Sequence, residues 1–340
     1  MKDLLQYEEI TGNPSPIIDL DPKDYSFFRD KTILITGAGG SIGSRIANHL
    51  AKVPNIKLLA VDRDENALHS LSLTISNTAL FQEASYVLLD IRDQVGVKRI
   101  FEESRPSLVI HCAALKHLSV LERFPREAVM TNVFGTKNLL DNAIKYGATE
   151  FLNVSTDKAV EPTSVLGRTK RIAELLVIQA RNEGANGFTN VRFGNVFNSK
   201  GSVIETFSHQ IQNNVPITLT DRNMSRYFMH IDEAAALAIK SSIINAGPIH
   251  ILDMGQPVLM SDVIDRIKST LKSNVEIVIT GSRQGEKLHE DLVNVFENSS
   301  ITSDPKIRVL SSSQAGIKID DSWQIDDNTT ALQFIDHHLA

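Results

Sequence analysis

Three glycines and an acid have the spacing of a binding site for a dinucleotide. Gly37, Gly40 and Gly43 form the pattern G-x-x-G-x-x-G between an apolar run and a helical pattern. Such a turn needs residues without Cβ atoms, because backbone N–H groups must approach a pyrophosphate at the helix N-terminus. Asp62 follows Gly43 by 19 residues, near the offset of about 20 at which an acid binds the adenosine ribose. The pattern favours NAD or NADP, although a tight strand-helix turn would explain the glycines alone.

The residues around Asp62 leave the choice of dinucleotide open. An acid at this position repels the 2′-phosphate of NADP, whereas Arg63 would bind that phosphate. Asp90 follows the next apolar run, where a carboxylate either reaches the adenine amine or caps the following helix. The predicted cofactor-binding residues from this part of the chain are Gly37, Gly40, Ser41, Ile42, Gly43, Asp62, Arg63, Asp90, Ile91, Ala113 and Ala114.

A polar stretch after the fifth apolar run is the second candidate for chemistry. Ser155 to Lys158 follow the run EFLNVS, so they lie at a carboxyl end of the sheet, where open α/β folds bind ligands. Leu166 and Lys170 are four residues apart in the following helix and project from one face. A solvated surface pair is the structural alternative for Asp157 and Lys158.

The elements that carry these residues alternate regularly. Apolar runs occupy 31–36, 56–62, 86–90, 108–114 and 150–155, and a sixth ends near Val191. Helical patterns separate them, ending near Lys52 and then over 64–75, 94–104 and 125–146. Apolar strands without alternation, separated by amphipathic helices, indicate a parallel sheet covered on both faces. We therefore expect a doubly wound α/β fold of Rossmann type.

The regular alternation weakens after Val191, which suggests a division of the chain. We expect an N-terminal extension over 1–30, a dinucleotide-binding domain over 31–193 and a smaller substrate-binding lobe over 194–300. Elements of this lobe can join the main sheet. The tail, 301–340, ends in a short helix over 329–340.

Several motifs together resemble a known family. The segments TGAGGSIGS, HCAALKHLSVLE, TNVFGTKNLL, STDKAVEPTSVLGRTK, RFGNVFNSKGSV and RQGEKLHEDL resemble the extended short-chain dehydrogenases/reductases. Among these they are similar to the CapD-like nucleotide-sugar 4,6-dehydratases that act on UDP-N-acetylglucosamine. The resemblance runs from about Pro16 to Val293. It implies a tightly bound NAD or NADP that takes a hydride from sugar C4, loss of water across C5 and C6, and return of the hydride to C6.

The resemblance also implies catalytic roles. Asp157 would protonate the departing C6 hydroxyl and receive the C4 hydroxyl proton, and Thr156 would hydrogen-bond the C4 oxygen. Lys158 would be the base at C5, with a pKa lowered by the neighbouring Lys170 and the nicotinamide. Lys170 matches the lysine of the family's Tyr-x-x-x-Lys pair and would hold the nicotinamide ribose. Leu166 stands in place of the tyrosine, and one branch of the family has methionine there.

The substrate residues implied by the resemblance come from four segments. The C-terminal lobe supplies two arginines whose planar guanidinium groups suit a diphosphate, and a helix start at 201–203 that attracts phosphate. Each of the two arginines, Arg226 and Arg283, could instead be an ordinary charged residue of the surface. His117 could instead be a histidine that packs against its neighbours. The implied residues are Lys116, His117, Asn195, Gly201, Ser202, Val203, Arg226, Arg283 and Glu286.

Composition limits the other possibilities. The 340 residues are 42% hydrophobic and 22% charged, as in globular proteins. A net charge of -6 argues against nucleic acid as a partner. The single Cys112 fits a reducing compartment, and no apolar run reaches the roughly 20 residues of a membrane span. With no secretory signal at the N-terminus, we expect a soluble cytoplasmic protein. We expect no metal site, because His337 and His338 lack further ligands at suitable spacing.

The leading hypothesis is a dehydratase that converts a UDP-sugar, expected to be UDP-N-acetylglucosamine, to a 4-keto-6-deoxy product. An epimerase or 4-ketoreductase on the same fold is an alternative, although a 4-epimerase ordinarily needs the missing tyrosine. A non-catalytic NAD-binding regulator is the second alternative, but it would not need Asp157, Lys158 and Lys170. The resemblance also suggests a homo-oligomer.

Overall fold

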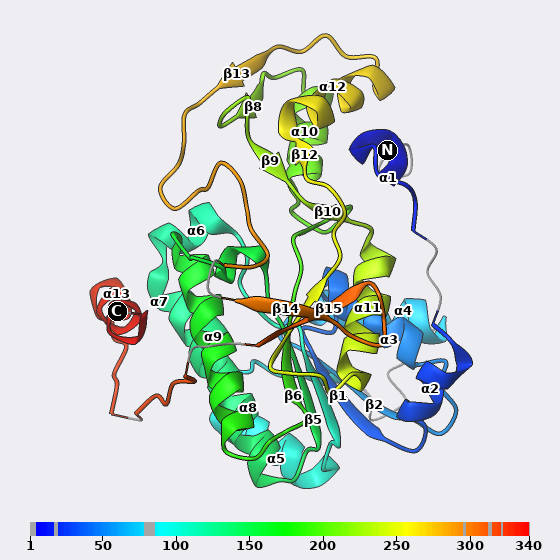
Figure 1. The fold of residues 1–340 in the computed structure, drawn as a ribbon, viewed down its shortest axis with the longest axis vertical. Coiled ribbons are helices and arrows are strands. Elements are labelled where there is room, and N and C mark those ends of the chain that lie inside the picture. Colours follow the sequence, from blue (N-terminus) through cyan, green and yellow to red (C-terminus); the bar gives the residue numbers. More distant parts are fainter. Residues whose placement is uncertain are drawn as a thin grey trace.

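A largely parallel sheet forms the centre of the molecule (Figure 1). The structure is a computed structural model that describes residues 5–16, 20–77, 86–294, 297–311, 315–320 and 322–339. Within these residues the sheet has nine strands, in the order β14-β15-β11-β6-β5-β4-β1-β2-β3. The six predicted apolar runs are β1 Thr32–Thr36, β2 Lys57–Asp62, β3 Tyr86–Leu88, β4 Leu108–His111, β5 Glu150–Val154 and β6 Phe188–Arg192. These six pair in parallel, so the predicted doubly wound α/β fold is confirmed.

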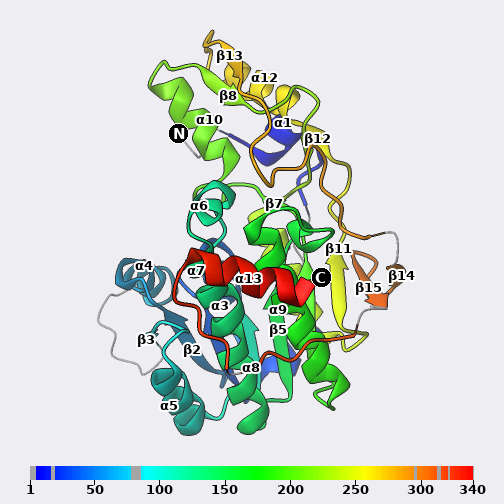
Figure 2. The ribbon, with the colours of Figure 1, turned by 90° about the vertical axis from the view of Figure 1, so that its left-hand side faces the viewer.

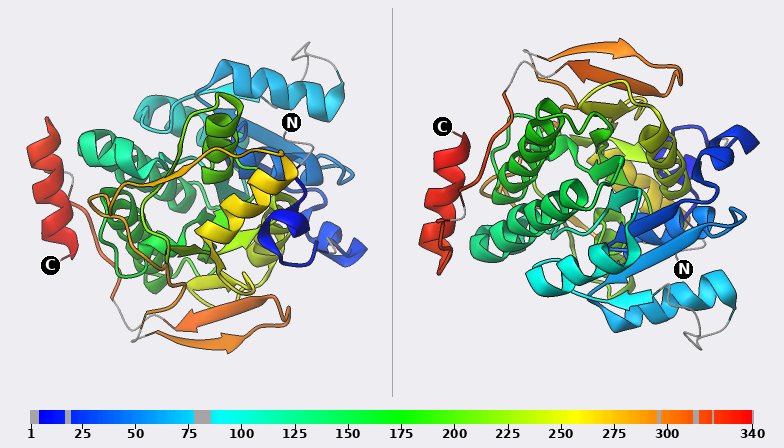
Figure 3. Two further views of the ribbon diagram at one scale, coloured as in Figure 1. Left: turned by 90° about the horizontal axis from the view of Figure 1, so that it is seen from above. Right: turned by 90° about the horizontal axis from the view of Figure 1, so that it is seen from below.

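The C-terminal half extends the same sheet. β11 (Ile249–Leu252) comes from the segment 194–300 and lies parallel to β6. β15 (Ile307–Ser311) runs antiparallel to β11, and β14 (Asn298–Ile301) runs antiparallel to β15. Figure 3 shows this pair in orange at the margin of the molecule. The two halves of the chain therefore share one sheet.

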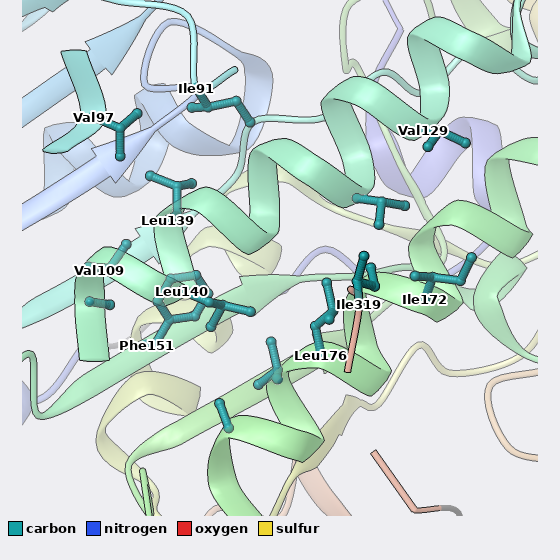
Figure 4. Close-up of a cluster of buried hydrophobic side chains, with 14 of the residues drawn as sticks. Ile91, Val97, Val109, Val129, Leu139, Leu140, Phe151, Ile172, Leu176 and Ile319 are labelled. Atoms are coloured by element: carbon teal, nitrogen blue, oxygen red, sulfur yellow. The ribbon is translucent and has the colours of Figure 1, made fainter. Parts of the chain in front are cut away.

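Helices cover both faces of the sheet. One apolar core lies between the strands and α5, α8 and α9, and includes Val97, Leu139 and Ile172 (Figure 4). A second core lies on the other face, where α2, α3 and α11 contribute Phe28, Ile46 and Leu237. The bounds are α2 Pro22–Phe28, α3 Ser41–Leu50, α4 Glu65–Ser76, α5 Gln94–Ser104, α6 Leu118–Arg123, α7 Pro125–Ala128, η2 Val129–Phe134, α8 Gly135–Lys145, η3 Asp157–Ala159, α9 Val165–Asn182 and α11 Ile231–Ile243. The helix predicted over 125–146 is α7, the π-helical turn η2 and α8 in succession.

A smaller lobe lies at one end of the sheet, at the top of Figure 1. Its core contains Phe207, Phe228 and Ile264. Three short strand pairs complete it: β7 with β10, β9 with β12, and β8 with β13. The bounds are β7 Asn195–Val196, α10 Val203–Gln212, β8 Ile217–Leu219, β9 Ser225–Arg226, β10 Phe228–Met229, β12 Val258–Leu259, α12 Met260–Thr270 and β13 Ile277–Ile279.

The N-terminal helix α1 (Tyr7–Thr11) packs into the core of this lobe. The Tyr7 hydroxyl donates a hydrogen bond of 2.8 Å to the carbonyl oxygen of Phe228. Arg266 of α12 donates one of 3.2 Å to the carbonyl oxygen of Ile10. The start of the chain is thus bound to an element more than two hundred residues later.

The C-terminal helix α13 (Asn328–Leu339) packs against α7 and α9 (Figure 2). Phe334 anchors it, with its ring 5.4 Å from that of Phe134 and 5.2 Å from that of Trp323. The rings of His337 and His338 lie 4.9 Å apart, and both lie near the ring of Trp323. Within the described ranges, no three histidine, cysteine or acidic side chains gather as metal ligands. Among the same residues, no helix combines the length and apolar character needed to cross a membrane.

Candidate active site

The glycine turn between β1 and α3 is closely packed. Gly37 has a φ of 65°, in the left-handed region that favours glycine. A Cβ atom on Gly43 would lie 2.2 Å from the carbonyl oxygen of Gly37, and one on Gly40 would lie 3.0 Å from the same oxygen. The helix can therefore begin against the strand only with glycine at position 43. This arrangement leaves the backbone N–H groups at the N-terminus of α3 accessible to a phosphate group of a ligand.

The turn forms one wall of an open cleft, whose free space of about 650 Å³ includes space that is continuous with solvent. Eight predicted cofactor residues line the cleft: Gly37, Gly40, Asp62, Arg63, Asp90, Ile91, Ala113 and Ala114. Thr131 of η2 also lines it and was not predicted. Ser41, Ile42 and Gly43 lie in the first turn of α3, and Lys170 lies on α9.

Asp62 is held in a fixed position at the end of β2. Its carboxylate accepts hydrogen bonds from the backbone N–H groups of Gly39, at 2.9 Å, and Asp64, at 3.0 Å. Arg63 is turned toward Asp90, with 3.6 Å between guanidinium and carboxylate. Asp90 also receives paired hydrogen bonds from Arg92. Partial burial opposes ionisation of Asp90, but the bonds and charge of Arg92 hold its pKa below the ordinary value.

Thr156, Asp157 and Lys158 lie together after β5. Asp157 is fully buried, and its Oδ1 accepts hydrogen bonds from the Thr156 hydroxyl at 2.8 Å and from Lys158 Nζ at 3.0 Å. Its other oxygen, Oδ2, is buried without a partner. Asn195, predicted to bind substrate, lies 3.4 Å from Lys158 Nζ through its side-chain oxygen. A buried carboxylate with one free oxygen beside an amine is suited to proton transfer.

The electrostatics of Lys158 differ from the expectation. Burial alone lowers the pKa of Lys158, but the charges of Asp157 and Glu290 outweigh it and raise that pKa above the ordinary value. Glu290 Oε1 lies 3.6 Å from Lys158 Nζ. The predicted lowering of the Lys158 pKa by Lys170 is wrong for this structure, because two carboxylates face the amine.

The pKa of Lys170, in contrast to that of Lys158, lies below its ordinary value. Burial lowers the pKa of Lys170 to about 8, against the opposing charge of Glu174. Its Nζ donates a hydrogen bond of 2.7 Å to the carbonyl oxygen of Val154, at the end of β5. Leu166, one turn earlier on α9, is 5% exposed and belongs to the apolar core. This position therefore supplies no hydroxyl group to the site.

A second polar chain runs beneath the cleft. Thr136 donates to the carbonyl oxygen of Asn132 and lies 2.9 Å from His111 Nε2. Nε2 must therefore carry the proton, and Nδ1 accepts the hydroxyl of Thr36 at 2.7 Å. Burial, with the charge of Lys170, lowers the pKa of His111 to about 3, so this histidine stays neutral and acts as a fixed link between β1, β4 and α8.

Asn132 in the π-helical turn is a further residue that the sequence reasoning missed. Its side chain accepts from the backbone N–H of Leu115 at 2.8 Å and donates to the carbonyl oxygen of Leu115 at 3.1 Å. These two bonds fix the loop after β4, which carries Ala113 and Ala114. The motif TNVFGT was part of the resemblance, but nothing in its residue types indicated a π-helical turn. Such turns are frequent at functional sites.

The predicted substrate residues near the cleft form a compact group. Lys116 Nζ donates a hydrogen bond of 2.6 Å to the carbonyl oxygen of Lys200. Lys200 N–H donates to the Ser41 hydroxyl at 3.0 Å. A Cβ atom on Gly201 would lie 2.5 Å from the ring of His117. Ser202 caps α10 by accepting the N–H of Glu205 at 3.3 Å, and Val203 is the first helical residue.

The two predicted arginines differ in their surroundings. Arg226 is buried, and its guanidinium donates to the carbonyl oxygens of Ser225, Lys287 and Leu288 at 2.7–3.0 Å. Much of its bonding capacity is thus used to hold the segment that leads to Glu290. Arg283 is exposed on the surface. Glu286 accepts the hydroxyl of Thr220 at 3.1 Å.

The fold and the site together define a class. A parallel sheet carries a glycine turn after its first strand, an acid after its second, and a Thr-Asp-Lys set after its fifth that precedes a helical lysine. These are the features of an extended short-chain dehydrogenase/reductase.

Comparison with known proteins identifies the family. The family model described as "Polysaccharide biosynthesis protein" matches residues 33–312. The chain belongs to this family, and the resemblance drawn from the motifs is confirmed.

Relatives in the family have more than one named activity. The capsular polysaccharide biosynthesis protein CapD of Staphylococcus aureus is 40% identical over 275 residues, which are 79% of this chain and 46% of that protein. The chain therefore spans about half the length of this relative. A UDP-glucose 4-epimerase of Rickettsia rickettsii is 32% identical over 79% of this chain and 80% of its own. The inverting UDP-N-acetylglucosamine 4,6-dehydratase of Campylobacter jejuni is 31% identical over 78% of each chain.

A solved structure agrees with the fold. The X-ray structure of Pen from Bacillus thuringiensis has a TM-score of 0.75 and 32% identity, and covers 85% of this chain and 92% of its own.

Proposed function

We propose that the protein is a nucleotide-sugar 4,6-dehydratase that converts UDP-N-acetylglucosamine to a UDP-4-keto-6-deoxy-hexosamine for polysaccharide biosynthesis. The observation that carries the proposal is the contact between the fully buried Asp157 and the partly exposed Lys158, 3.0 Å apart, with Asp157 Oδ2 left without a partner. An elimination needs one group that removes a proton and one that protonates the leaving hydroxyl. This pair supplies both.

The cleft fits a dinucleotide, and we propose NAD. Gly43 lets α3 begin close against the turn, since a Cβ atom there would lie 2.2 Å from the carbonyl oxygen of Gly37, and Gly37 and Gly40 line the cleft, as expected for a pyrophosphate-binding turn. Asp62, fixed by two backbone N–H groups, faces the cleft with a negative charge that repels a 2′-phosphate. Arg63 is turned to Asp90 instead of being free for such a phosphate. Lys170 would hold the nicotinamide ribose.

The residues of the chain account for the proton movements. A bound NAD would supply the oxidation at C4 and the later reduction at C6. Asp157 Oδ2 accepts the proton of the C4 hydroxyl. In the family's Tyr-x-x-x-Lys pair the tyrosine would take this proton, but Leu166 stands in its place. Lys158 removes the C5 proton, and Asp157 returns its proton to the C6 hydroxyl, which departs as water. Lys158 then reprotonates C5, so both residues return to their starting states.

A 4-epimerase is the second candidate, since a relative with that name matches a similar share of the chain. An epimerase needs only oxidation and reduction at C4, so it has no use for a base at C5. Leu166 also removes the tyrosine that such an enzyme ordinarily uses. Both features support elimination over epimerisation.

The test is incubation of the protein with UDP-N-acetylglucosamine in deuterated water, followed by NMR and mass spectrometry. We expect loss of one water and deuterium at C5, and no such product from Asp157→Asn or Lys158→Ala. Formation of the C4 epimer without loss of water would support the epimerase. If the protein converted none of a panel of UDP-, GDP- and dTDP-sugars, the proposal that it is a nucleotide-sugar enzyme would be excluded.

A further inference from the structure

Glu290 is a buried carboxylate beside the proposed catalytic pair. It is 5% exposed, and its Oε1 lies 3.6 Å from Lys158 Nζ. Its Oε2 is buried without a hydrogen-bond partner. Lys158 therefore lies between two carboxylates, each with one unpaired oxygen, since Asp157 Oδ2 is also unpartnered.

The position of Glu290 is built into the fold. Arg226 bonds the carbonyl oxygens of Lys287 and Leu288 at 2.9 and 3.0 Å. Lys287 donates from its Nζ to the carbonyl oxygen of Val160 at 2.7 Å, and Thr163 donates to that of Gly285 at 3.0 Å. The bonds of Arg226 attach the segment 285–290 to β9, and those with Val160 and Thr163 attach it to the loop after β5. Burying an acid in this way costs free energy unless its charge is paired and hydrogen-bonded or the group becomes neutral.

Lys158 cannot act as a base while it is an ammonium. Its pKa is raised above the ordinary value by the adjacent carboxylates, so the proton must be transferred before C5 is attacked. Asp157 is the wrong destination, because in the proposed reaction it takes the C4 hydroxyl proton. Burial raises the pKa of Glu290, and the charge of Asp157 adds to this, while Lys158, Arg226 and Lys287 oppose it.

We infer that Glu290 is the proton acceptor that converts the Lys158 ammonium to the free amine, an inference that rests on the proposed dehydration. An Nζ–H bond of Lys158 breaks and an O–H bond forms on Glu290. The amine then takes the C5 proton, the C5–H electrons form the C5–C6 double bond, and the C6–O bond breaks as Asp157 protonates the departing oxygen. After Lys158 reprotonates C5, Glu290 returns its proton to the amine.

The substitution Glu290→Gln tests this role, because glutamine keeps the shape and one accepting oxygen but cannot take up the proton as a carboxylate does. We expect water loss and deuterium incorporation at C5 to fall by about 10²–10⁴-fold. Oxidation at C4, followed as reduced nicotinamide in a single turnover, should persist, and Glu290→Asp should restore part of the exchange at C5. Asp291→Asn, the same chemical change at the exposed neighbour, should have no effect.

A second measurement uses the unchanged sequence. Infrared difference spectra on addition of substrate should contain a carboxylic-acid carbonyl band that shifts when glutamate, but not aspartate, is isotopically labelled. The inference would be overturned if Glu290→Gln exchanged the C5 proton at the rate of the unchanged protein, or if C4 oxidation and C5 exchange fell equally in that variant. It would also be overturned if the spectra contained no band from a protonated glutamate. Failure of the unchanged protein to release water would instead reject the proposed function.

Discussion

Glu174 and Arg192 form a paired ion bridge inside the core, with Nε–Oε1 and Nη2–Oε2 distances of 2.7 and 2.8 Å. Both side chains are fully buried. Glu174 Oε1 also accepts the hydroxyl of Ser155 at 2.7 Å, one residue before Thr156. The bridge therefore joins α9, β6 and the start of the loop that carries the proposed catalytic pair.

Removal of one partner should be severe. We expect Glu174→Ala to lower the free energy of unfolding by about 3–5 kcal/mol, because Arg192 keeps a buried charge with less compensation. Urea unfolding followed by circular dichroism measures this. Lys137→Ala, which breaks the exposed pair with Asp141, should cost less than about 1 kcal/mol. Equal effects of the two substitutions would contradict the assignment.

The same bridge predicts sensitivity to acid. Burial opposes ionisation of Glu174, but Arg192 and Arg171 lower its pKa from 4.5 to about 2. Since the pKa in the folded state lies below that in the unfolded chain, this stabilisation is complete above about pH 4.5 and is lost as the pH falls toward 2. The difference in unfolding free energy between the wild type and Glu174→Gln should therefore shrink over this window. A constant difference would argue against the lowered pKa.

The elements and the glycine turn could be predicted because buried parallel strands have continuous apolar runs. The strand β14 could not be predicted, because Asn298, Ser299 and Ser300 have no strand-like pattern. Only its pairing with β15 makes this segment a strand. Glu290 lies in the charged segment EKLHED, whose composition is typical of a surface loop. Its burial depends on Arg226, so only tertiary structure reveals it.

Position 43 should tolerate no side chain. We expect Gly43→Ala to weaken NAD binding at least tenfold and to destabilise the fold by about 1–3 kcal/mol, because its Cβ would lie 2.2 Å from a carbonyl oxygen. Gly40→Ala, at 3.0 Å from the same atom, should have a smaller effect. Calorimetric titration with NAD compares the two, and a reversed order would disprove the packing argument.

Asp62 should decide the choice of cofactor. The unchanged protein should bind NAD more tightly than NADP, and Asp62→Asn should narrow that preference about tenfold by removing the charge that repels the 2′-phosphate. Asparagine keeps an oxygen that can accept the N–H of Gly39, so the turn should survive. Tighter binding of NADP by the unchanged protein would reverse this assignment.

Leu166 should be replaceable without loss of elimination. Leu166→Tyr inserts a larger side chain into a core position that is 5% exposed, so we expect destabilisation by about 1–3 kcal/mol. Water loss should remain measurable, because Asp157 carries the proton of the C4 hydroxyl. Leu166→Met should change stability by less than about 1.5 kcal/mol. Product formation measured by mass spectrometry tests both, and its abolition in Leu166→Met would refute the role of Asp157.

The hydrogen bond between Tyr7 and Phe228 links the N-terminal helix α1 to the smaller lobe. Phe228 follows Arg226 by two residues, so a displacement of the lobe around a bound sugar nucleotide would carry α1 with it. Glu8 and Glu9 of that helix are exposed. A fluorophore attached at either position would test whether the lobe is displaced when a sugar nucleotide is added, and it would leave the residues of the proposed reaction unmodified.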